Sequence, residues 1–300
     1  MAITIDDLPY VTGYASRPMS RSDAHAATIS NIRLLDVLAK HHVPVTGFVI
    51  EKSLESIGRP VGRGILRDWI DEGFDLGNHS YAHLDFNKLT AAEMEDQILR
   101  GEATIAPLMH DAGRQLQFFR FPFNHTGDTL AKHETLAAFL AQHKYRLAPC
   151  TIENEDWMFA ESFFRMRAHY KDADARRLID DYLKFTGAQI DYFAALNKQI
   201  FGYEPPEILL IHDNALNAET MDRLLGLFEA RGYQFVSLTE AESDPAYSTP
   251  ESFVTSYGPM WGYRWAKVKG IPVDGRKEPD PPGWIVHYEV PRTTPLHHKG

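Results

Sequence analysis

Short apolar runs that alternate with longer helical patterns constrain this chain more than any other feature of its sequence. Seven runs rich in β-branched and aromatic residues predict strands, and stretches with apolar residues at helical spacing separate most of them. The predicted strands are Ala2–Ile5, Pro44–Ile50, Phe74–Gly77, Leu116–Phe121, Tyr145–Cys150, Glu207–His212 and Tyr233–Ser237. Strands joined by crossover helices pair in parallel, so the chain is predicted to be an α/β protein. Seven such units favour a closed or nearly closed (β/α) barrel, with an open doubly wound sheet as the competing fold.

The predicted helices between these strands are Ala24–His41, Arg63–Glu72, Thr90–His110, Asp128–His143 and Glu219–Arg231. Two regions depart from the alternation. The stretch Met158–Phe201 predicts two helices broken near Gly187, and the helical pattern stops after about residue 240. We therefore expect a single domain over residues 1–300. It would have a core at 2–240, a helical insertion at about 158–205 and an aromatic C-terminal wrap at 241–300.

The cysteine count and the net charge exclude several kinds of metal site and binding partner. A single cysteine, Cys150, excludes an intramolecular disulfide framework and any multi-thiolate zinc site, so His and carboxylates must hold any metal. The net charge of −10 argues against binding nucleic acid or an anionic membrane by bulk electrostatics. Because no apolar run approaches about 18 residues, we expect no membrane-spanning helix.

Two groups of metal-ligating residue types follow predicted strands. Asp6 and Asp7 end the first strand, where active sites of (β/α) barrels are built, although an acid pair before a proline is also a common turn feature. His79 and His83 follow the third strand, and two His four apart face the same way on a helical turn. With Asp7 they would form a two-His, one-carboxylate site. Such a site suits Zn²⁺ hydrolysis or Fe²⁺ oxygen chemistry.

Three further features lie at or just after predicted strands. Arg120 stands in an apolar strand and requires a buried anionic partner, which a structural salt bridge would also satisfy. The acidic stretch 153–157 follows the fifth strand and includes Asp156 and Trp157; a solvated acidic loop is the simpler interpretation. His212 lies at the end of a predicted buried strand. A histidine in this place suits acid–base catalysis, and the alternative is a core histidine that is hydrogen-bonded to backbone.

Taken in order, these features resemble the five motifs of the polysaccharide deacetylase family, the carbohydrate esterase family four or NodB-homology enzymes. The matching segments are Thr4-Ile5-Asp6-Asp7, His79-Ser80-x-x-His83, Arg120-Phe121-Pro122, Asp156-Trp157 and Leu210-Ile211-His212. The resemblance covers residues 2–240 and implies a distorted (β/α)7–8 barrel. It also implies a metal-dependent enzyme that hydrolyses the N-acetyl group of amino sugars in a glycan or oligosaccharide and releases acetate.

The resemblance also implies a role for each matched residue. Asp7, His79 and His83 would hold one divalent metal ion, with Zn²⁺ expected and Co²⁺, Ni²⁺ or Mn²⁺ as alternatives. Asp6 would be the general base, oriented and kept ionised by Arg120. His212 would be the general acid, paired with Asp156. The backbone N–H of Phe123 would complete an oxyanion hole, and Trp157 and Leu210 would wall the acetyl pocket.

Four departures from the family pattern bear on the substrate more than on the reaction. Leu8 replaces a glycine after the paired Asp, the link 10–24 is long, and Phe123-Asn124 replaces a Tyr-Gly pair. The segment 158–201 is also longer than usual, and with the tail it would add walls beside the site. Such walls favour a glycan end or a short oligomer over a long polymer.

Several alternatives stay open on the sequence alone. An O-acetyl esterase acting on a polysaccharide such as acetylxylan, or a hydrolase of small linear or cyclic amides, would use the same motifs. A non-catalytic glycan-binding protein and an iron oxygenase are more remote. The expected partner is an acetylated carbohydrate, with no nucleic acid, and the motifs do not indicate an oligomeric state. Family habit and the start directly before a strand favour a secreted or periplasmic protein, with the cytoplasm as the alternative.

Overall fold

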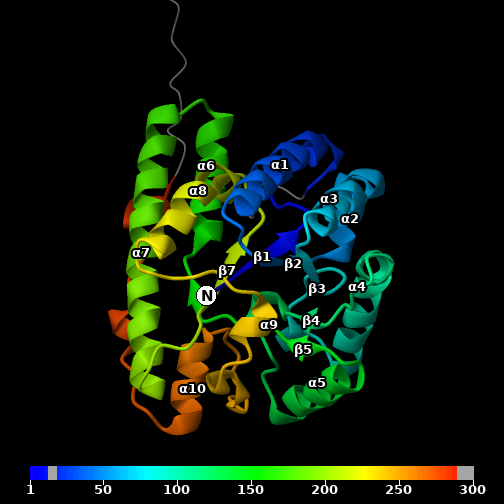
Figure 1. Ribbon diagram of the computed structural model, residues 1–300, viewed down its shortest axis with the longest axis vertical. Coiled ribbons are helices and arrows are strands. Elements are labelled where there is room, and N and C mark those ends of the chain that lie inside the picture. The colour runs from blue at the N-terminus through cyan, green and yellow to red at the C-terminus, as the bar shows by residue number, and fades with distance from the viewer. Residues whose placement is uncertain (13–18, 289–300) are drawn as a thin grey trace, which may run out of the picture.

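A curled sheet of seven parallel strands forms the centre of the computed structural model, which describes residues 1–12 and 19–288 (Figure 1). The strands are β1 (Ala2–Leu8), β2 (Val45–Val49), β3 (Asp75–Asn78), β4 (Phe118–Phe119), β5 (Arg146–Leu147), β6 (Ile152–Glu153) and β7 (Ile208–His212). Their spatial order is β5-β4-β3-β2-β1-β7-β6, and neighbouring strands in the described residues pair in parallel. This is the cyclic order of a (β/α) barrel opened between β5 and β6, which confirms the distorted barrel over the doubly wound alternative.

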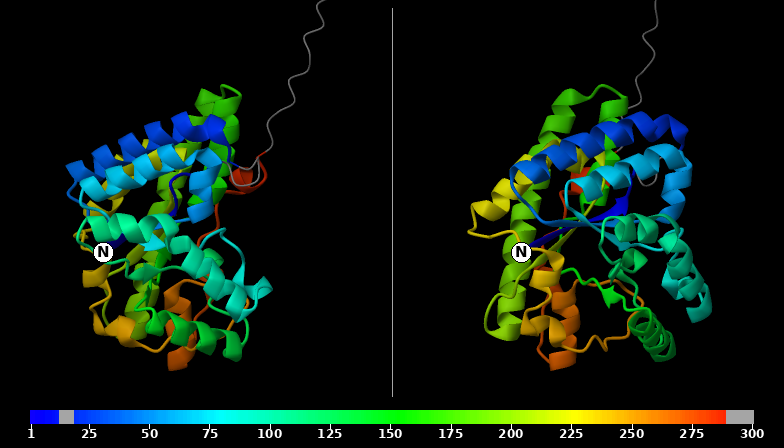
Figure 2. Two further views of the ribbon diagram at one scale, coloured as in Figure 1. Left: turned by 90° about the vertical axis from the view of Figure 1, so that its right-hand side faces the viewer. Right: turned by 45° about the vertical axis from the view of Figure 1, so that its right-hand side comes forward.

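Helices surround the sheet (Figures 1 and 2). They are α1 (Ala24–Lys40), α2 (Glu51–Ile57), α3 (Arg59–Asp71), α4 (Ala91–Asp111), α5 (Leu130–Gln142), α6 (Asp156–Ala168), α7 (Asp172–Phe201), α8 (Ala215–Glu229), α9 (Leu238–Ala241), α10 (Trp261–Lys269) and α11 (Gly283–Val286). Within the described residues, none of them has both the length and the apolar character needed to span a bilayer. A capping box begins α4: Thr90 Oγ1 accepts from Glu93 N, and Glu93 Oε2 accepts from Thr90 N.

The structure corrects the predicted break near Gly187. Two helices do form, but they part at residues 169–171, between α6 and α7, and Gly187 lies inside the continuous α7. A Cβ on Gly187 would lie 3.0 Å from Nη2 of Arg231, which donates to the Gly187 carbonyl. Glycine therefore serves here to let a guanidinium approach the helix backbone, rather than to end the helix.

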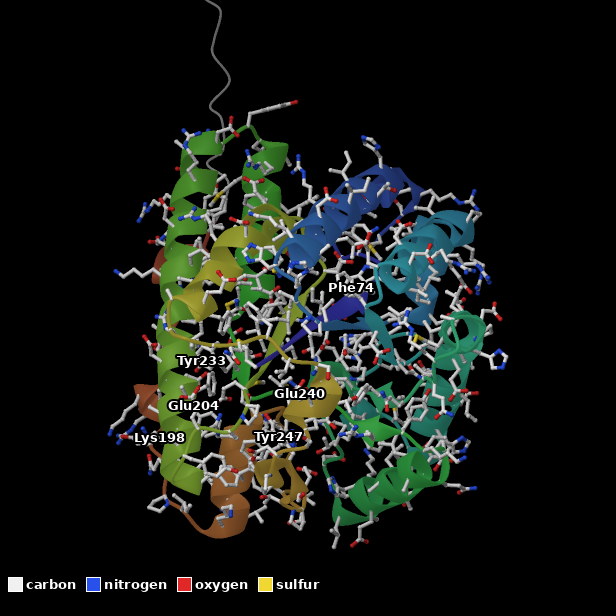
Figure 3. The ribbon with its side chains drawn as sticks, viewed as in Figure 1. Phe74, Lys198, Glu204, Tyr233, Glu240 and Tyr247 are labelled. Atoms are coloured by element: carbon white, nitrogen blue, oxygen red, sulfur yellow. The ribbon has the colours of Figure 1, made fainter. Side chains whose placement is uncertain are left out.

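The predicted strand Tyr233–Ser237 is also wrong. This segment is irregular, and its backbone bonds to Met1, just ahead of β1: Met1 N donates to Gln234 O (2.6 Å) and Val236 N donates to Met1 O (2.9 Å). Tyr233 instead donates from its hydroxyl to Glu204, and Figure 3 shows these two side chains beside α7. A run of β-forming residues needs a partner strand along its length, and here the neighbouring backbone is already paired.

Two other elements escaped the sequence patterns. β6 is only two residues long. α2 has only seven residues and follows β2 directly, so its pattern falls short of the 11–18 residues over which helical periodicity is recognised. The tail is not wholly irregular either, because α10 is a helix of nine residues that packs on α7. Residues 289–300 of the expected wrap lie outside the described residues.

The opening between β5 and β6 is bridged by other parts of the chain. Only residues 148–151 join these two strands, without a crossover helix. Trp261 N, at the start of α10, donates to Cys150 O (2.9 Å), and Thr151 N donates to Ile208 O (2.9 Å). The C-terminal part, coloured gold to orange, lies at the lower end of the molecule on the side of α5 (Figure 2).

Replacing Gly47 by Ala should destabilise the fold. A Cβ at this position in β2 would lie 2.5 Å from Leu8 Cδ2 and 2.8 Å from Trp69 Cζ3, and both side chains are fully buried. Overpacking of this kind costs about 1–3 kcal/mol, measured as the loss in free energy of unfolding in a denaturant titration. Gly64→Ala in α3 is the control, because nothing lies within 4 Å and the change should stabilise by up to about 1 kcal/mol. Equal effects of the two substitutions would contradict this packing.

Candidate active site

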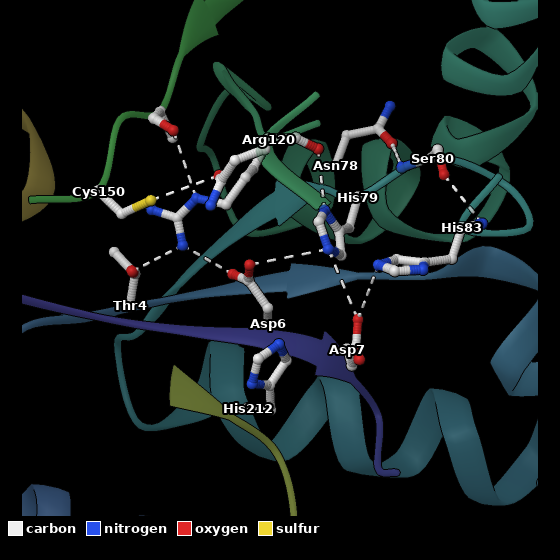
Figure 4. A network of polar contacts seen from close by, with 12 residues as sticks. Thr4, Asp6, Asp7, Asn78, His79, Ser80, His83, Arg120, Cys150 and His212 are labelled. Carbon is white, nitrogen blue, oxygen red and sulfur yellow. Dashed lines mark hydrogen bonds and ion pairs between the residues drawn. The ribbon is translucent and has the colours of Figure 1, made fainter. Parts of the chain in front are cut away.

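The predicted site residues converge at the carboxyl ends of the strands (Figure 4). Asp6 and Asp7 lie near the end of β1, His79 directly follows β3, and His212 ends β7. Arg120 follows β4, and its backbone N donates to Asn78 O (3.0 Å). Because parallel strands present their carboxyl ends at one edge, residues from distant parts of the chain meet here, as expected from the sequence.

Adjacent carboxylates on a strand point to opposite faces, yet Asp6 and Asp7 both serve the same site. Asp7 has a positive φ of 66°, and the register of β1 against β2 shifts between Ile5 and Leu8. Asp6 Oδ1 lies 2.7 Å from Arg120 Nη1. The irregularity in β1 thus turns the second carboxylate toward the histidines.

Asp7, His79 and His83 form the one cluster among the described residues that has the ligand arrangement of a metal site. Their ligand atoms all lie within 4.8 Å of one another. Asp7 Oδ1 is 3.5 Å from His79 Nε2 and 3.6 Å from His83 Nε2. Asp7 Oδ1 is buried and has no hydrogen-bond partner in the described chain, which is costly for a carboxylate oxygen. Two imidazoles and one carboxylate suit Zn²⁺ and similar divalent ions, so these residues fit a metal.

The protonation of His79 supports this fit. Its Nδ1 lies 2.9 Å from the carbonyl oxygen of Arg120, which can only accept, so Nδ1 carries the proton and Nε2 keeps a free lone pair. Burial, followed by the neighbouring His83, lowers the pKa of His79 to about 3. The ring is therefore neutral at physiological pH, which is the form that binds metals.

Arg120 is fully buried and has a partner for every nitrogen of its guanidinium. Besides Asp6, its Nη1 donates to Thr4 Oγ1 (2.7 Å). Its Nε donates to Ala148 O (3.3 Å) and its Nη2 to Pro149 O (3.1 Å). The last two acceptors belong to the segment that separates β5 from β6. Asp6 is thus the anionic partner predicted for Arg120. Arg120 also provides hydrogen bonds for two backbone carbonyls at the gap in the barrel.

His212 and Asp156 form a hydrogen-bonded pair opposite Arg120. His212 Nδ1 lies 2.7 Å from Asp156 Oδ1. The other oxygen, Oδ2, accepts from His212 N (2.9 Å), Asn214 Nδ2 (2.9 Å) and Asn217 Nδ2 (2.6 Å). Burial by itself would lower the pKa of His212, but the charge and hydrogen bond of Asp156, together with Asp7 and Asp6, raise it to about 10. The ring is therefore held as an imidazolium at neutral pH.

The remaining predicted residues flank this centre to different extents. The Phe123 side chain is 53% exposed, and its ring centroid lies 4.6 Å from that of His83. Trp157 is 39% exposed at the start of α6, whereas Leu210 is buried in β7. The acidic stretch is not a fully solvated loop, because Asn154 and Asp156 are buried.

Sequence reasoning missed several residues that hold the site together. They are Thr4, Asn78, Asn214 and Asn217. Asn214 carries a local signal, since it follows a strand and caps α8. Asn217, one turn into that helix, has none, because its role depends on Asp156, which lies 61 residues earlier.

Comparison with known proteins agrees with this geometry. Residues 1–141, which hold Asp6, Asp7, His79, His83 and Arg120, match the family model described as polysaccharide deacetylase. This N-terminal part of the chain is thus similar to the polysaccharide deacetylase family. Two relatives of this family are a bifunctional xylanase/deacetylase of Pseudobutyrivibrio xylanivorans (24% identical over 221 residues) and the peptidoglycan-N-acetylglucosamine deacetylase PgdA of Listeria monocytogenes (23% over 208 residues). The matches cover 73% and 69% of this chain but only 29% and 34% of the relatives, so the chain spans about a third of their length.

A solved structure supports the polysaccharide deacetylase fold independently. A mutant of BA3943, described as a CE4 family pseudoenzyme with restored enzymatic activity, superposes with a TM-score of 0.52. It is 18% identical, and the alignment covers 80% of this chain and 66% of that one. At this identity the likeness concerns the fold alone, so the chemistry must be argued from the residues of this chain.

Replacing Asp156 by Asn should lower the pKa of His212. The amide keeps the size of the side chain but removes the negative charge that contributes most to raising the pKa of His212, so this pKa should fall from about 10. Imidazole NMR shifts followed against pH measure this directly. His41, whose pKa is raised by hydrogen bonds to Asp222 and Glu229 far from the site, is the internal control. A His212 ring still protonated at pH 9 in the variant would contradict the assignment.

Proposed function

We propose that this protein is a metal-dependent deacetylase that hydrolyses the N-acetyl group of amino sugars in a glycan or oligosaccharide. The observation that carries the proposal is the Asp7–His79–His83 cluster with its unpartnered Asp7 oxygen. Beside it lie Asp6, a carboxylate paired with Arg120, and His212, an imidazolium paired with Asp156. One metal site, one base and one acid within a single centre are what hydrolysis of an amide requires.

Asp7, His79 and His83 would hold the divalent ion, for which we propose Zn²⁺. When bound there, such an ion supplies Lewis acidity toward a carbonyl oxygen and toward water. Asp6 is proposed as the general base that accepts the proton of the attacking water. Arg120 fixes the orientation of Asp6 through a 2.7 Å contact and balances its charge. Base catalysis needs this fixed geometry, because the accepting oxygen must lie within hydrogen-bond reach of the water.

His212 is proposed as the general acid. Breaking an amide releases an amine, which is a poor leaving group until its nitrogen is protonated. An imidazolium with a pKa of about 10 holds its proton at neutral pH. Asp156 binds the ring through Nδ1, so Nε2 is the nitrogen proposed to donate the proton. A two-group mechanism requires such a proton donor in addition to the base.

We propose that the backbone N–H of Phe123 stabilises the tetrahedral oxyanion, and that Trp157 and Leu210 wall the acetyl pocket. The exposed Phe123 side chain beside His83 supports this placement. The sugar assignment draws on relatives whose names include peptidoglycan-N-acetylglucosamine deacetylase and chitooligosaccharide deacetylase. The same names favour a location outside the cytoplasm. We further propose that residues 1–300 act as one catalytic domain, and that helices α6 and α7 add a wall that favours short glycans or chain ends.

Acetate release across a panel of substrates, with and without chelator, tests the proposed reaction. We expect release from N-acetylated chitooligosaccharides or peptidoglycan fragments, loss of activity with chelator and recovery with Zn²⁺. Faster release from acetylxylan would identify an O-acetyl esterase instead, and turnover of small amides alone would identify an amidase. Binding of glycans by the metal-loaded protein without any acetate release would establish a non-catalytic role.

Two substitutions separate the proposed metal ligands from the proposed base. Asp6→Asn should reduce kcat by about 10²–10⁴ while the bound metal stays, because the base is lost and the three ligands remain. His83→Ala should remove metal and activity together. Metal content by elemental analysis and acetate release measure both outcomes. Loss of metal in Asp6→Asn, or activity of His83→Ala without metal, would contradict the division of roles.

A further inference from the structure

The turn 121–126, which carries Phe123 beside the metal cluster, has an unusual backbone. Phe123 has φ 58° and Asn124 has φ 54°, so two consecutive residues other than glycine lie in the left-handed region. Each such residue costs about 1–3 kcal/mol and persists only where surrounding contacts enforce it. The question is therefore which part of the molecule holds this turn in place.

The contacts come from the C-terminal segment 251–264, which lies outside the matched region 1–141. Arg264, in α10, is 1% exposed and donates from Nη2 to Asn124 O (2.6 Å) and from Nη1 to Thr126 Oγ1 (2.9 Å). Its other contacts anchor it within the tail: Nη1 bonds Glu251 Oε1 (2.9 Å) and Nε bonds Pro259 O (3.0 Å). One buried guanidinium thus joins the tail to Asn124, the second residue of the strained pair, and to Thr126, two residues later.

Two further contacts fix the same turn. A Cβ built on Gly258 would overlap the carbonyl oxygen of Phe123, so the tail backbone lies directly against the turn. Glu251 also binds His133, whose Nε2 lies 2.9 Å from Glu251 Oε2. His133 Nδ1 lies 3.2 Å from Thr126 O, so the tail reaches the turn a second time through this ring.

We infer that Arg264 is a positioning residue for the reaction, acting through the turn that carries Phe123. This inference rests on the proposed function, in which the N–H of Phe123 stabilises the oxyanion. A donor that stabilises a transition state must be held within a fraction of an ångström, and displacement by about 1 Å can cost about 100-fold in rate. The tail is then part of the catalytic apparatus rather than an external wrap.

The test compares Arg264→Met and Gly258→Ala, which disturb the turn from two independent directions. In the full-length, metal-loaded protein both should lower kcat by about 10- to 100-fold, with KM changed less than about threefold and metal content unchanged. Arg264→Lys keeps the charge and should recover part of kcat. Hydrogen exchange of the amides at 121–127 should rise in Arg264→Met and Gly258→Ala.

Matched controls separate positioning from general stability. Arg114 also donates to three backbone carbonyls, those of Ile70, Gly73 and Phe74, but away from the site. Arg114→Met should lower thermal stability without lowering kcat. Gly226→Ala lies inside α8 with nothing within 4 Å of the new methyl, so it should leave kcat unchanged and should not lower thermal stability. Unchanged exchange at 121–127 in both tail variants, or a loss of stability without a loss of kcat, would overturn the inference. Hydrogen exchange reports how firmly the turn 121–126 is held and does not require catalysis. A parent protein that is inactive on every substrate would therefore refute the proposed function, but not the conclusion that Arg264 holds this turn.

Discussion

The buried guanidinium of Arg120 is the interaction on which both the sheet and the site depend. A parallel barrel that stops pairing between β5 and β6 leaves backbone carbonyls at its edge, and unpaired buried carbonyls are costly. Arg120 donates to two of them, at Ala148 and Pro149, while its remaining nitrogen binds Asp6 and Thr4. The charge that completes the fold at the gap is therefore the same charge that orients the candidate base.

The sequence predicted the sheet well where strands are long and their ends carry polar residues. β1, β2, β3 and β7 were all found within a few residues, and the metal cluster follows from where their carboxyl ends meet. Short elements were missed for a physical reason. Two-residue strands such as β6 are defined by a partner's backbone and not by their own side chains, and the segment 233–237 shows the converse, a strand-like composition without a partner.

The support of the site could not be read from the sequence because it is built from long-range contacts. Asn217 and Arg264 are ordinary polar residues on helices, and such residues usually face solvent. Only the folded chain brings Asn217 to Asp156 and Arg264 to the turn 121–126. The motif residues could be predicted because they lie at or soon after the ends of strands. The contacts that Asn217 and Arg264 make could not, because they join residues that are 61 and 140 positions apart in the sequence.

The gap between β5 and β6 also bears on how the chain assembles during synthesis. Domains generally form as units once their residues have left the ribosome. Here Trp261 N donates to Cys150 O at the edge of the sheet, so this contact cannot form until the chain has been made as far as residue 261. Until then the nascent chain exposes a sheet edge and a strained turn. Formation of the candidate site is thereby coupled to synthesis of α10, and translation products that end before this helix would lack the contacts that hold the turn 121–126.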